Sequence, residues 1–208
     1  MSQNDADDLP NLDEEYDLGG QCAPPGTYEI DVISLETYDG QNEAMKGDAI
    51  MCRLTYRVAD VVHEDTPLSK EEQEKEQEYF KYTHGVKAGQ VLTWQGKIGP
   101  FVVNRKTGQK ELPYDCAKNA GRVQALIQSI LRFEPGSQKT KDAVERDGSK
   151  VSWNKYFNAA KSEKNPFEGK PVRMVQARVK TKNHTMITPS FAVSSRVQVR
   201  ESNVLDSL

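Results

Sequence analysis

The stretch AIMCRLTYRV (residues 49–58) alternates between apolar and other side chains along its whole length. A period of two is typical of a β-strand that buries one face and exposes the other. The predicted core face consists of Ile50, Cys52, Leu54, Tyr56 and Val58. The opposite face presents Arg53 and Arg57. The sequence therefore predicts a strand with a core on one side and a basic surface on the other.

Further strands are predicted on both sides of this one. The upstream stretch TYEIDVISL (27–35) alternates in the same way and is followed by a predicted turn at residues 39–42. The downstream strands are QVLTWQ (90–95), IGPFVVN (98–104), VRMVQARVKT (172–181) and TMITPSFAVSSRVQVR (185–200), with a break at Gly96-Lys97 and a turn at 106–110. Pro189 indicates an edge or a bend, because proline has no N–H to donate to a neighbouring strand.

Two helices of clear pattern are predicted between these strands. Ser69 and Glu72 have the spacing of a capping box, which begins a charged helix over about 70–82. A second helix over about 116–133, with Asp115 as its N-cap, carries apolar residues at helical spacing and is expected to pack on the core. These apolar residues are Ala120, Val123, Leu126, Ile127 and Ile130.

The order of elements favours a mainly β domain. Two strands and a strand pair precede the 116–133 helix, and two more strands follow a polar loop and a short helix predicted over 152–162. A five-stranded OB-fold-like barrel has this order, with its central helix between strands three and four. An unrelated β-sandwich or α+β domain is the alternative. The predicted organisation is a disordered acidic tail (1–25), a single OB-like domain (26–200) with a charged helical insertion (about 64–85) and a polar loop (134–150), and a C-terminal tail (201–208).

Charge is divided into two blocks. Residues 1–78 contain 21 Asp/Glu and 5 Lys/Arg, a net charge of -16, whereas residues 79–208 contain 10 acidic and 23 basic residues, a net charge of +13. The whole chain therefore has a formal net charge of only -3. Such asymmetry is typical of a protein that offers a basic surface to a polyanion and also carries an acidic arm.

The composition indicates a modest core with polar appendages. Of the 208 residues, 36% are hydrophobic and 28% are charged. No stretch approaches the roughly 18 consecutive apolar residues of a membrane helix, and the acidic N-terminus lacks the apolar segment of a signal peptide. Cys22, Cys52 and Cys116 are widely spaced, which favours free thiols in a reducing compartment. We therefore expect a soluble intracellular protein without a membrane partner.

The motifs of common enzymes are missing. The chain has no phosphate-binding loop GxxxxGK[ST], no GxGxxG, no HExxH and no GxSxG. His63, His84 and His184 are far apart and have no cysteine nearby, so the sequence offers no pair of metal ligands at the usual spacing. The acidic run 71–78 is typical of a solvated helix face, and Cys52 lies on an apolar strand face. The prediction is a non-enzymatic protein with no metal and no cofactor.

Basic residues close to aromatic ones indicate a site for single-stranded nucleic acid. Such a site needs cations that follow the phosphates and aromatic faces on which bases stack. The strand at 172–182 is expected to place Arg178, Lys180 and Lys182 on the face opposite Val175, Ala177 and Val179, so that these cations point outward. Trp94, by contrast, is expected in the core together with Tyr28 and Tyr56, and Trp153 fits either location. The predicted binding residues are Arg53, Arg57, Tyr82, Lys87, Lys97, Phe101, Arg105, Lys106, Trp153, Lys155, Tyr156, Arg178, Lys180 and Lys182.

Several stretches together resemble a known group of proteins. These are GTYEIDVISLE (26–36), GDAIMCRLTYRV (47–58), RVQALIQSIL (122–131) and NPFEGKPVRMVQARVKTK (165–182). The chain is similar over about residues 24–200 to the small replication-associated proteins of tailed bacteriophages, which are themselves similar to OB-fold single-stranded DNA-binding proteins. The shared motifs are structural turns, so no site residue is carried over. The resemblance implies a protein that coats single-stranded DNA with low sequence specificity during phage DNA replication or recombination, in the cytoplasm of an infected bacterial host.

Two other functions stay open on the sequence. The acidic block 1–78 could dock on a basic host or viral protein, or imitate DNA toward a nuclease. Alternatively, the strands could mediate oligomerisation in a virion structural or assembly protein. The resemblance implies an acidic C-terminal tail that contacts replication or recombination proteins, but ESNVLDSL is only weakly acidic. In the DNA-binding interpretation, either the acidic N-terminal tail takes this role through residues 1–18, or it competes with DNA for the basic groove. The sequence is compatible with a homo-oligomer and does not fix its size.

Overall fold

Two long antiparallel strands form the centre of the fold in the computed structural model, which describes residues 22–42, 47–76, 84–137, 158–159, 165–180 and 185–197. They are β1 (Gly26–Asn42) and β2 (Gly47–Glu64), and their register runs from Gly26 opposite Glu64 to Asn42 opposite Gly47. The turn predicted at residues 39–42 is therefore wrong, because β1 continues through these residues. Three register shifts interrupt the pairing, and each changes which side chains of β1 face the core.

The main sheet has five strands in the order β3-β2-β1-β6-β7, and every neighbouring pair is antiparallel. The further strands are β3 (Val91–Gly99), β6 (Pro171–Lys180) and β7 (Thr185–Val193). β3 passes without interruption through the break predicted at Gly96-Lys97. Pro189 lies on β7, an edge strand, as its missing N–H predicts.

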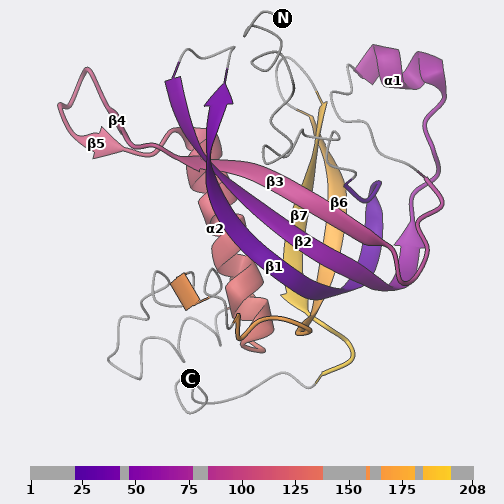
Figure 1. Ribbon diagram of the computed structural model, residues 1–208. Coiled ribbons are helices and arrows are strands. Elements are labelled where there is room, and N and C mark those ends of the chain that lie inside the picture. Colours follow the sequence, from indigo (N-terminus) through magenta and orange to yellow (C-terminus); the bar gives the residue numbers. More distant parts are fainter. Residues whose placement is uncertain are drawn as a thin grey trace, which may run out of the picture.

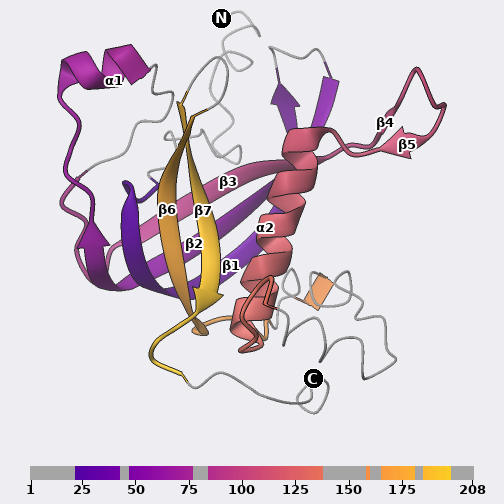
Figure 2. The same ribbon diagram turned by 180° about the vertical axis from the view of Figure 1, so that it is seen from behind.

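The sheet curves strongly but does not close (Figures 1 and 2). Its two edges meet through side chains: the rings of Trp94 on β3 and Phe191 on β7 lie edge to face, with centroids 6.5 Å apart. Helix α2 (Tyr114–Ile130) spans the opening. The Asn119 side-chain amide donates to the carbonyl oxygen of Lys97 on β3 at 2.9 Å, and Arg122 Nε donates to the carbonyl oxygen of Pro189 on β7 at 3.2 Å.

The mainly β class and the five sheet strands agree with the sequence-based prediction, whereas a closed barrel is not formed. The reason lies at the two edges. A ladder between β3 and β7 would need the carbonyl oxygens that Asn119 and Arg122 occupy, and Pro189 has no N–H to contribute to it. The helix and its side chains therefore stand where a β3–β7 ladder would close the barrel.

Helix α2 packs on the core with the predicted face. Val123, Leu126 and Ile127 are buried, while Ala120 and Ile130 are half-buried. The helix begins two residues earlier than predicted, and Pro113 occupies the N-cap position. The prediction of Asp115 as N-cap is wrong, because Asp115 lies inside the first turn, where its negative charge still favours the positive end of the helix dipole.

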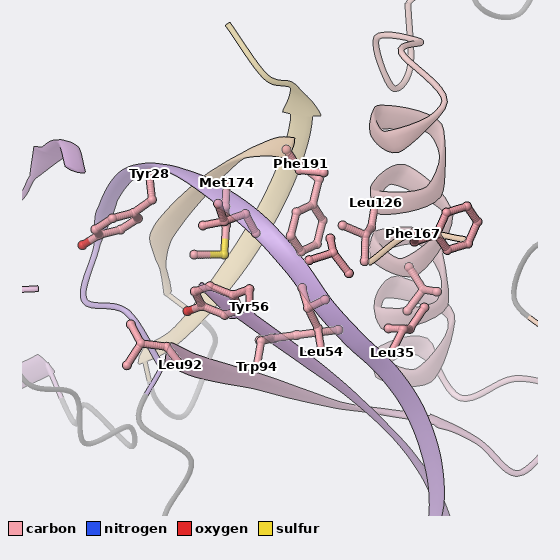
Figure 3. Close-up of a cluster of buried hydrophobic side chains, with 14 of the residues drawn as sticks. Tyr28, Leu35, Leu54, Tyr56, Leu92, Trp94, Leu126, Phe167, Met174 and Phe191 are labelled. Carbon is pink, nitrogen blue, oxygen red and sulfur yellow. The ribbon is translucent and has the colours of Figure 1, made fainter. Parts of the chain in front are cut away.

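The core lies between the concave face of the sheet and α2. Figure 3 shows Leu126 pointing from α2 toward the strands, where aromatic and aliphatic side chains gather. Cys52, Tyr28, Tyr56 and Trp94 are all buried, as predicted. The largest fully buried side chains include Tyr28, Tyr56, Phe167, Leu35, Leu54, Leu126 and Met174.

The chain joins this core four residues before the predicted domain boundary. Cys22 and Ala23 are buried, and the Ala23 N–H donates to the Tyr56 hydroxyl at 3.2 Å. The Tyr28 hydroxyl in turn donates to the carbonyl oxygen of Pro24 at 2.9 Å. The predicted tail 1–25 is thus too long at its end, since residues 22–25 are packed. Residues 1–21 lie outside the described residues, as do 138–157 and 198–208.

Helix α1 (Lys70–Glu76) follows β2 and begins with the predicted capping box. The Ser69 N–H donates to Glu72 Oε2 at 2.8 Å, and the Glu72 N–H donates to Ser69 Oγ at 3.2 Å. The rest of the predicted helix, from residue 77, lies outside the described ranges. Of the helix predicted over 152–162, only residues 158–159 are described, and they are helical.

A small hairpin leaves the main sheet between β3 and α2. It consists of β4 (Val102–Val103) and β5 (Lys110–Glu111), joined by the predicted turn. In both views it projects away from the sheet, on the side opposite α1 (Figures 1 and 2). The strand predicted over 98–104 is therefore divided: its first two residues end β3, and the rest leads into this hairpin. Residues 100–113 are called the arm below.

Candidate nucleic-acid interface

The outward-facing side chains of β2 and β3 form the first part of the candidate interface, called the outer face below. Arg53 and Arg57 point away from the core, because the residues between them, Leu54 and Tyr56, are buried. Arg53 stands opposite Gln95 of β3, and Arg57 stands opposite Val91. Arg53 and Arg57 thus lie on the side of the sheet away from the core, as the alternation in the sequence predicts.

Tyr38 connects this face to β1. Its hydroxyl donates to Gln95 Oε1 at 2.8 Å, and the guanidinium carbon of Arg53 lies 4.8 Å from the centre of its ring. This cation–π contact and the hydrogen bond link three neighbouring strands through side chains alone. Tyr38 and Gln95 are members of the interface that the sequence analysis missed. The register shifts in β1 hide the orientation of Tyr38 from any period-two pattern.

Carboxylates moderate the charge of the outer face. In the β1–β2 register, Arg53 lies opposite Glu36 and Arg57 lies opposite Asp31. Asp31 already accepts a hydrogen bond from Arg196 at 2.7 Å. Lys97, farther along β3, lies opposite Met51 of β2, two residues before the end of the strand from which the arm departs.

The arm carries apolar and basic side chains that are largely in water. Phe101 is 63% exposed and Val103 is 58% exposed. Asn104 shapes the tip: its side-chain amide donates to Glu111 Oε1, and its Oδ1 accepts from the Lys106 N–H, each at 2.8 Å. The cations of the arm, all exposed, are Arg105, Lys106 and Lys110. Of these, the sequence analysis singled out Arg105 and Lys106 and missed Lys110.

Tyr114 lies where the arm joins α2. It is the first residue of the helix and is 71% exposed, and Lys118 Nζ lies 4.5 Å from the centre of its ring. Neither residue was singled out from the sequence. The available signal was their spacing of four, which brings side chains together on a helix surface. The predicted helix began at residue 116, however, and so did not include Tyr114.

Three of the predicted cations lie at the other end of the sheet. Lys87 precedes β3 in a turn where the Gly89 N–H donates to the carbonyl oxygen of Val58. Arg178 forms an ion pair with Asp65 at 3.7 Å, and Lys180 ends β6. The nine residues of β3 separate this end from the arm, a distance of about 30 Å at the usual rise per residue. The structure therefore does not bring these three together with the arm.

The predicted orientation of β6 is wrong. Val172, Met174 and Gln176 are buried, so Arg178 and Lys180 continue the inward-facing side beyond the end of the core. Val175, Ala177 and Val179 point outward, and Val179 is 40% exposed. The small apolar residues of the strand's second half suggested a core face, but the pairing of β6 with β1 buries its first half. The other predicted residues, Tyr82, Trp153, Lys155, Tyr156 and Lys182, lie outside the described residues.

Part of the acidic block is used inside the fold. The carboxylate of Glu29, which is buried, accepts hydrogen bonds from Arg173 Nε at 2.8 Å and from the hydroxyls of Ser194 and Ser195 at 2.5 and 2.7 Å. Burial alone would raise the pKa of Glu29, but these hydrogen bonds outweigh it and hold the pKa below its ordinary value. This network joins the end of β7 to β1 across β6.

Glu64 has a similar internal role at the end of β2. Its carboxylate accepts from the N–H groups of Gly85 and Val86 at 2.8 and 3.1 Å, and His84 Nδ1 lies 3.1 Å away. Burial raises the pKa of Glu64, and the hydrogen bonds lower it by more, so the net shift is downward. These hydrogen bonds hold residues 84–86, which precede β3, against the end of β2. The acidic residues of β1 and β2 therefore do not all belong to an independent arm.

Neither clustered metal ligands nor a long apolar helix occurs in the described ranges. These ranges contain no group of three or more His, Cys, Asp or Glu side chains that could hold a metal ion. Over the same residues, no helix has the length and apolar character needed to cross a membrane. What distinguishes this surface chemically is the combination of cations and aromatic rings on the outer face and the arm.

Comparison with models of known protein families gives no match, and comparison with curated protein sequences gives none either. The resemblance to phage replication-associated proteins therefore stays a prediction from the sequence.

Proposed function

We propose that this protein binds single-stranded DNA with low sequence specificity and coats it during phage DNA replication or recombination. The observation that carries the proposal is the arrangement of the outer face and the arm. Arg53 lies on β2, Lys97 on β3 and three further cations on the arm that continues from β3, and the arm also carries the exposed ring of Phe101. Cations in a row beside aromatic faces are what an unpaired strand needs.

The arrangement of the strands supports the same proposal. OB-fold proteins are small, partly open barrels that bind oligonucleotides on the face formed by their second and third strands. Here the second and third strands of the sheet are β2 and β3, and α2 falls between the third and fourth. We therefore assign the domain to an OB-like architecture that opens between β3 and β7.

The proposed mechanism is binding without chemistry. The cations neutralise phosphates and release their counterions, which makes the affinity dependent on salt. Stacking on aromatic rings adds affinity without distinguishing the bases, because every base has a π-face. Such a protein is not an enzyme and needs no metal or cofactor. We assign its site of action to the cytoplasm of the infected bacterial host, and contacts with replication or recombination proteins to the acidic residues 1–21.

The test is fluorescence anisotropy with a labelled dT oligonucleotide of about 30 nucleotides, at two salt concentrations, with duplex of the same length as the control. We expect a Kd in the micromolar range or tighter for the single strand, weakened by salt, and poorer binding of the duplex. Absence of binding at low salt would overturn the proposal.

In that event the acidic block would become the candidate surface. Glu71, Glu72 and Glu74 of α1 are exposed and lie at the opposite end of the molecule from the arm (Figure 1). The rival function as a docking or DNA-mimic protein would then depend on the acidic block 1–78 without Glu29 and Glu64, which are used internally. A pull-down with the full chain and a Glu71→Lys/Glu74→Lys variant as control would test it.

A further inference from the structure

Within the part of the chain that the structure describes, the exposed aromatic rings lie at one place. Among the aromatic residues in the described ranges, most are buried in the core and Tyr38 is half-buried, so that only Phe101 and Tyr114 are exposed. Both lie at the base of the arm. Phe101 directly precedes β4, and Tyr114 follows β5 by three residues, with Val102 opposite Glu111 between them.

Basic residues also lie in and beside the arm. Lys118 is held over the Tyr114 ring, and Lys97 lies at the end of β3 from which the arm departs. The arm itself adds Arg105, Lys106 and Lys110, with Glu111 as its acidic residue. Contiguous exposed apolar patches at a protein surface indicate a contact with another molecule, and Phe101, Val102, Val103 and Tyr114 are exposed at successive positions of the arm and its junction with α2. The surplus of positive charge indicates that this molecule is an anion. The exposed rings indicate that it also has flat apolar faces.

We propose that Phe101 and Tyr114, which lie where the arm joins the sheet and α2, stack on unpaired nucleobases. The phosphates then contact the outer face and the cations of the arm. This inference rests on the proposed function and adds a division of labour to it: one region binds the backbone of any nucleic acid, and the other recognises that the strand is single. In a duplex the faces of the bases are covered by their neighbours, so these two rings have nothing to stack on.

The experiment combines two changes: an aromatic ring is removed from the protein, and the bases are removed from the oligonucleotide. Phe101→Leu and Tyr114→Leu keep an apolar side chain but remove the π-face, and Tyr114→Phe keeps the ring and serves as the matched control. Each protein is titrated with dT oligonucleotide and with an abasic oligonucleotide of the same length, which has the same phosphates and no bases. Thermal melting of every variant checks that these exposed positions leave the fold intact.

We expect the wild-type protein to prefer dT over the abasic strand. Each leucine variant should lose about 5- to 150-fold in affinity for dT, the range for one stacked base, and change little toward the abasic strand. The preference for dT should therefore fall in both leucine variants and persist in Tyr114→Phe. The salt dependence for dT should stay the same, because the phosphate contacts are untouched.

Equal binding of dT by the wild type and both leucine variants would overturn this inference and leave the proposed function standing. A loss of equal size toward dT and the abasic strand would overturn it as well, because the rings would then act on the backbone. If the wild-type protein binds neither strand, the proposed function fails, and the inference fails with it.

Discussion

Glu29 shows how a single side chain connects distant parts of this protein. Its carboxylate is buried between β1, β6 and the residues after β7, and it is held ionised by Arg173, Ser194 and Ser195. Its pKa is lower in the folded protein than in the unfolded chain, where it is about 4.3. The group therefore contributes stability above that pH, and the contribution is lost as pH falls through the folded pKa.

Glu29→Gln should lower the free energy of unfolding at pH 7 by about 1–3 kcal/mol, since the amide cannot accept the same set of hydrogen bonds. The loss should be smaller at a pH low enough to protonate the wild-type carboxylate as well, below its lowered folded pKa. Urea denaturation at the two pH values measures both numbers. Glu36→Gln, at an exposed position of the same strand, is the control and should change stability little at either pH. An equal loss at both pH values would contradict the assigned ionisation.

Replacing glycine by alanine is expected to change stability in opposite directions at Gly26 and at Gly121. Gly26 has a φ of +156°, and a Cβ there would collide with the carbonyl oxygen of His63 on β2. Gly26→Ala should therefore destabilise the protein by more than about 1 kcal/mol. Gly121 lies on the exposed side of α2 with open space around it, so Gly121→Ala should stabilise by about 0.5–1 kcal/mol. Thermal melting of both variants checks the signs, and a shift in the same direction would contradict this account.

At the scale of elements, the pattern of apolar residues predicted most of the fold. The alternation in β2 and the apolar face of α2 were predicted from local periodicity, and the buried residues of both elements agree with it. The break predicted at Gly96 failed for a tertiary reason: a Cβ at Gly96 would lie 2.6 Å from the Trp94 ring, so the glycine makes room for the indole inside a continuous strand. The orientation of β6 failed because it depends on which half of the strand pairs with β1.

The side-chain bridge from α2 to the sheet edges makes a second element-scale prediction. Asn119→Ala removes the hydrogen bond to the Lys97 carbonyl oxygen and the acceptor for Arg122. We expect a loss of about 1–2 kcal/mol in the free energy of unfolding and faster hydrogen exchange of the amides along β3 and β7. Lys118→Ala, one residue away and exposed, is the matched control. Unchanged exchange at both edges would show that core packing alone holds the helix in place.

At the scale of the whole molecule, the two charge blocks of the sequence are less separate than they look. The ion pairs Glu29–Arg173, Asp31–Arg196 and Asp65–Arg178 each join one block to the other. Sequence alone cannot show these pairs, because their partners are more than a hundred residues apart along the chain. The prediction of a basic surface therefore included Arg178, which the fold pairs with a carboxylate, and missed Lys110 and Lys118.

The position of the cations determines the salt dependence of binding. Replacing Arg105, Lys106 and Lys110 together by glutamine should reduce the slope of log Kd against log salt by about 2, at roughly 0.7 per phosphate contact on a single strand. The matched control is Lys87→Gln/Lys180→Gln at the far end of the sheet, which should leave the slope unchanged. Anisotropy titrations at several salt concentrations measure it. A larger change in the control would assign the phosphate path to that end.

The Glu29 network also has a consequence for the order in which the protein forms during synthesis. Ser194 is 165 residues from the carboxylate that it binds, so the network needs every strand of the main sheet to have been synthesised. A nascent chain that has left the ribosome only as far as β6 can place Arg173 beside Glu29, but the two serines are still missing. Contacts of such long range are formed slowly, because the loop between them must close first. The first strand of the sheet is thus completed only after β7 and the two serines that follow it have left the ribosome.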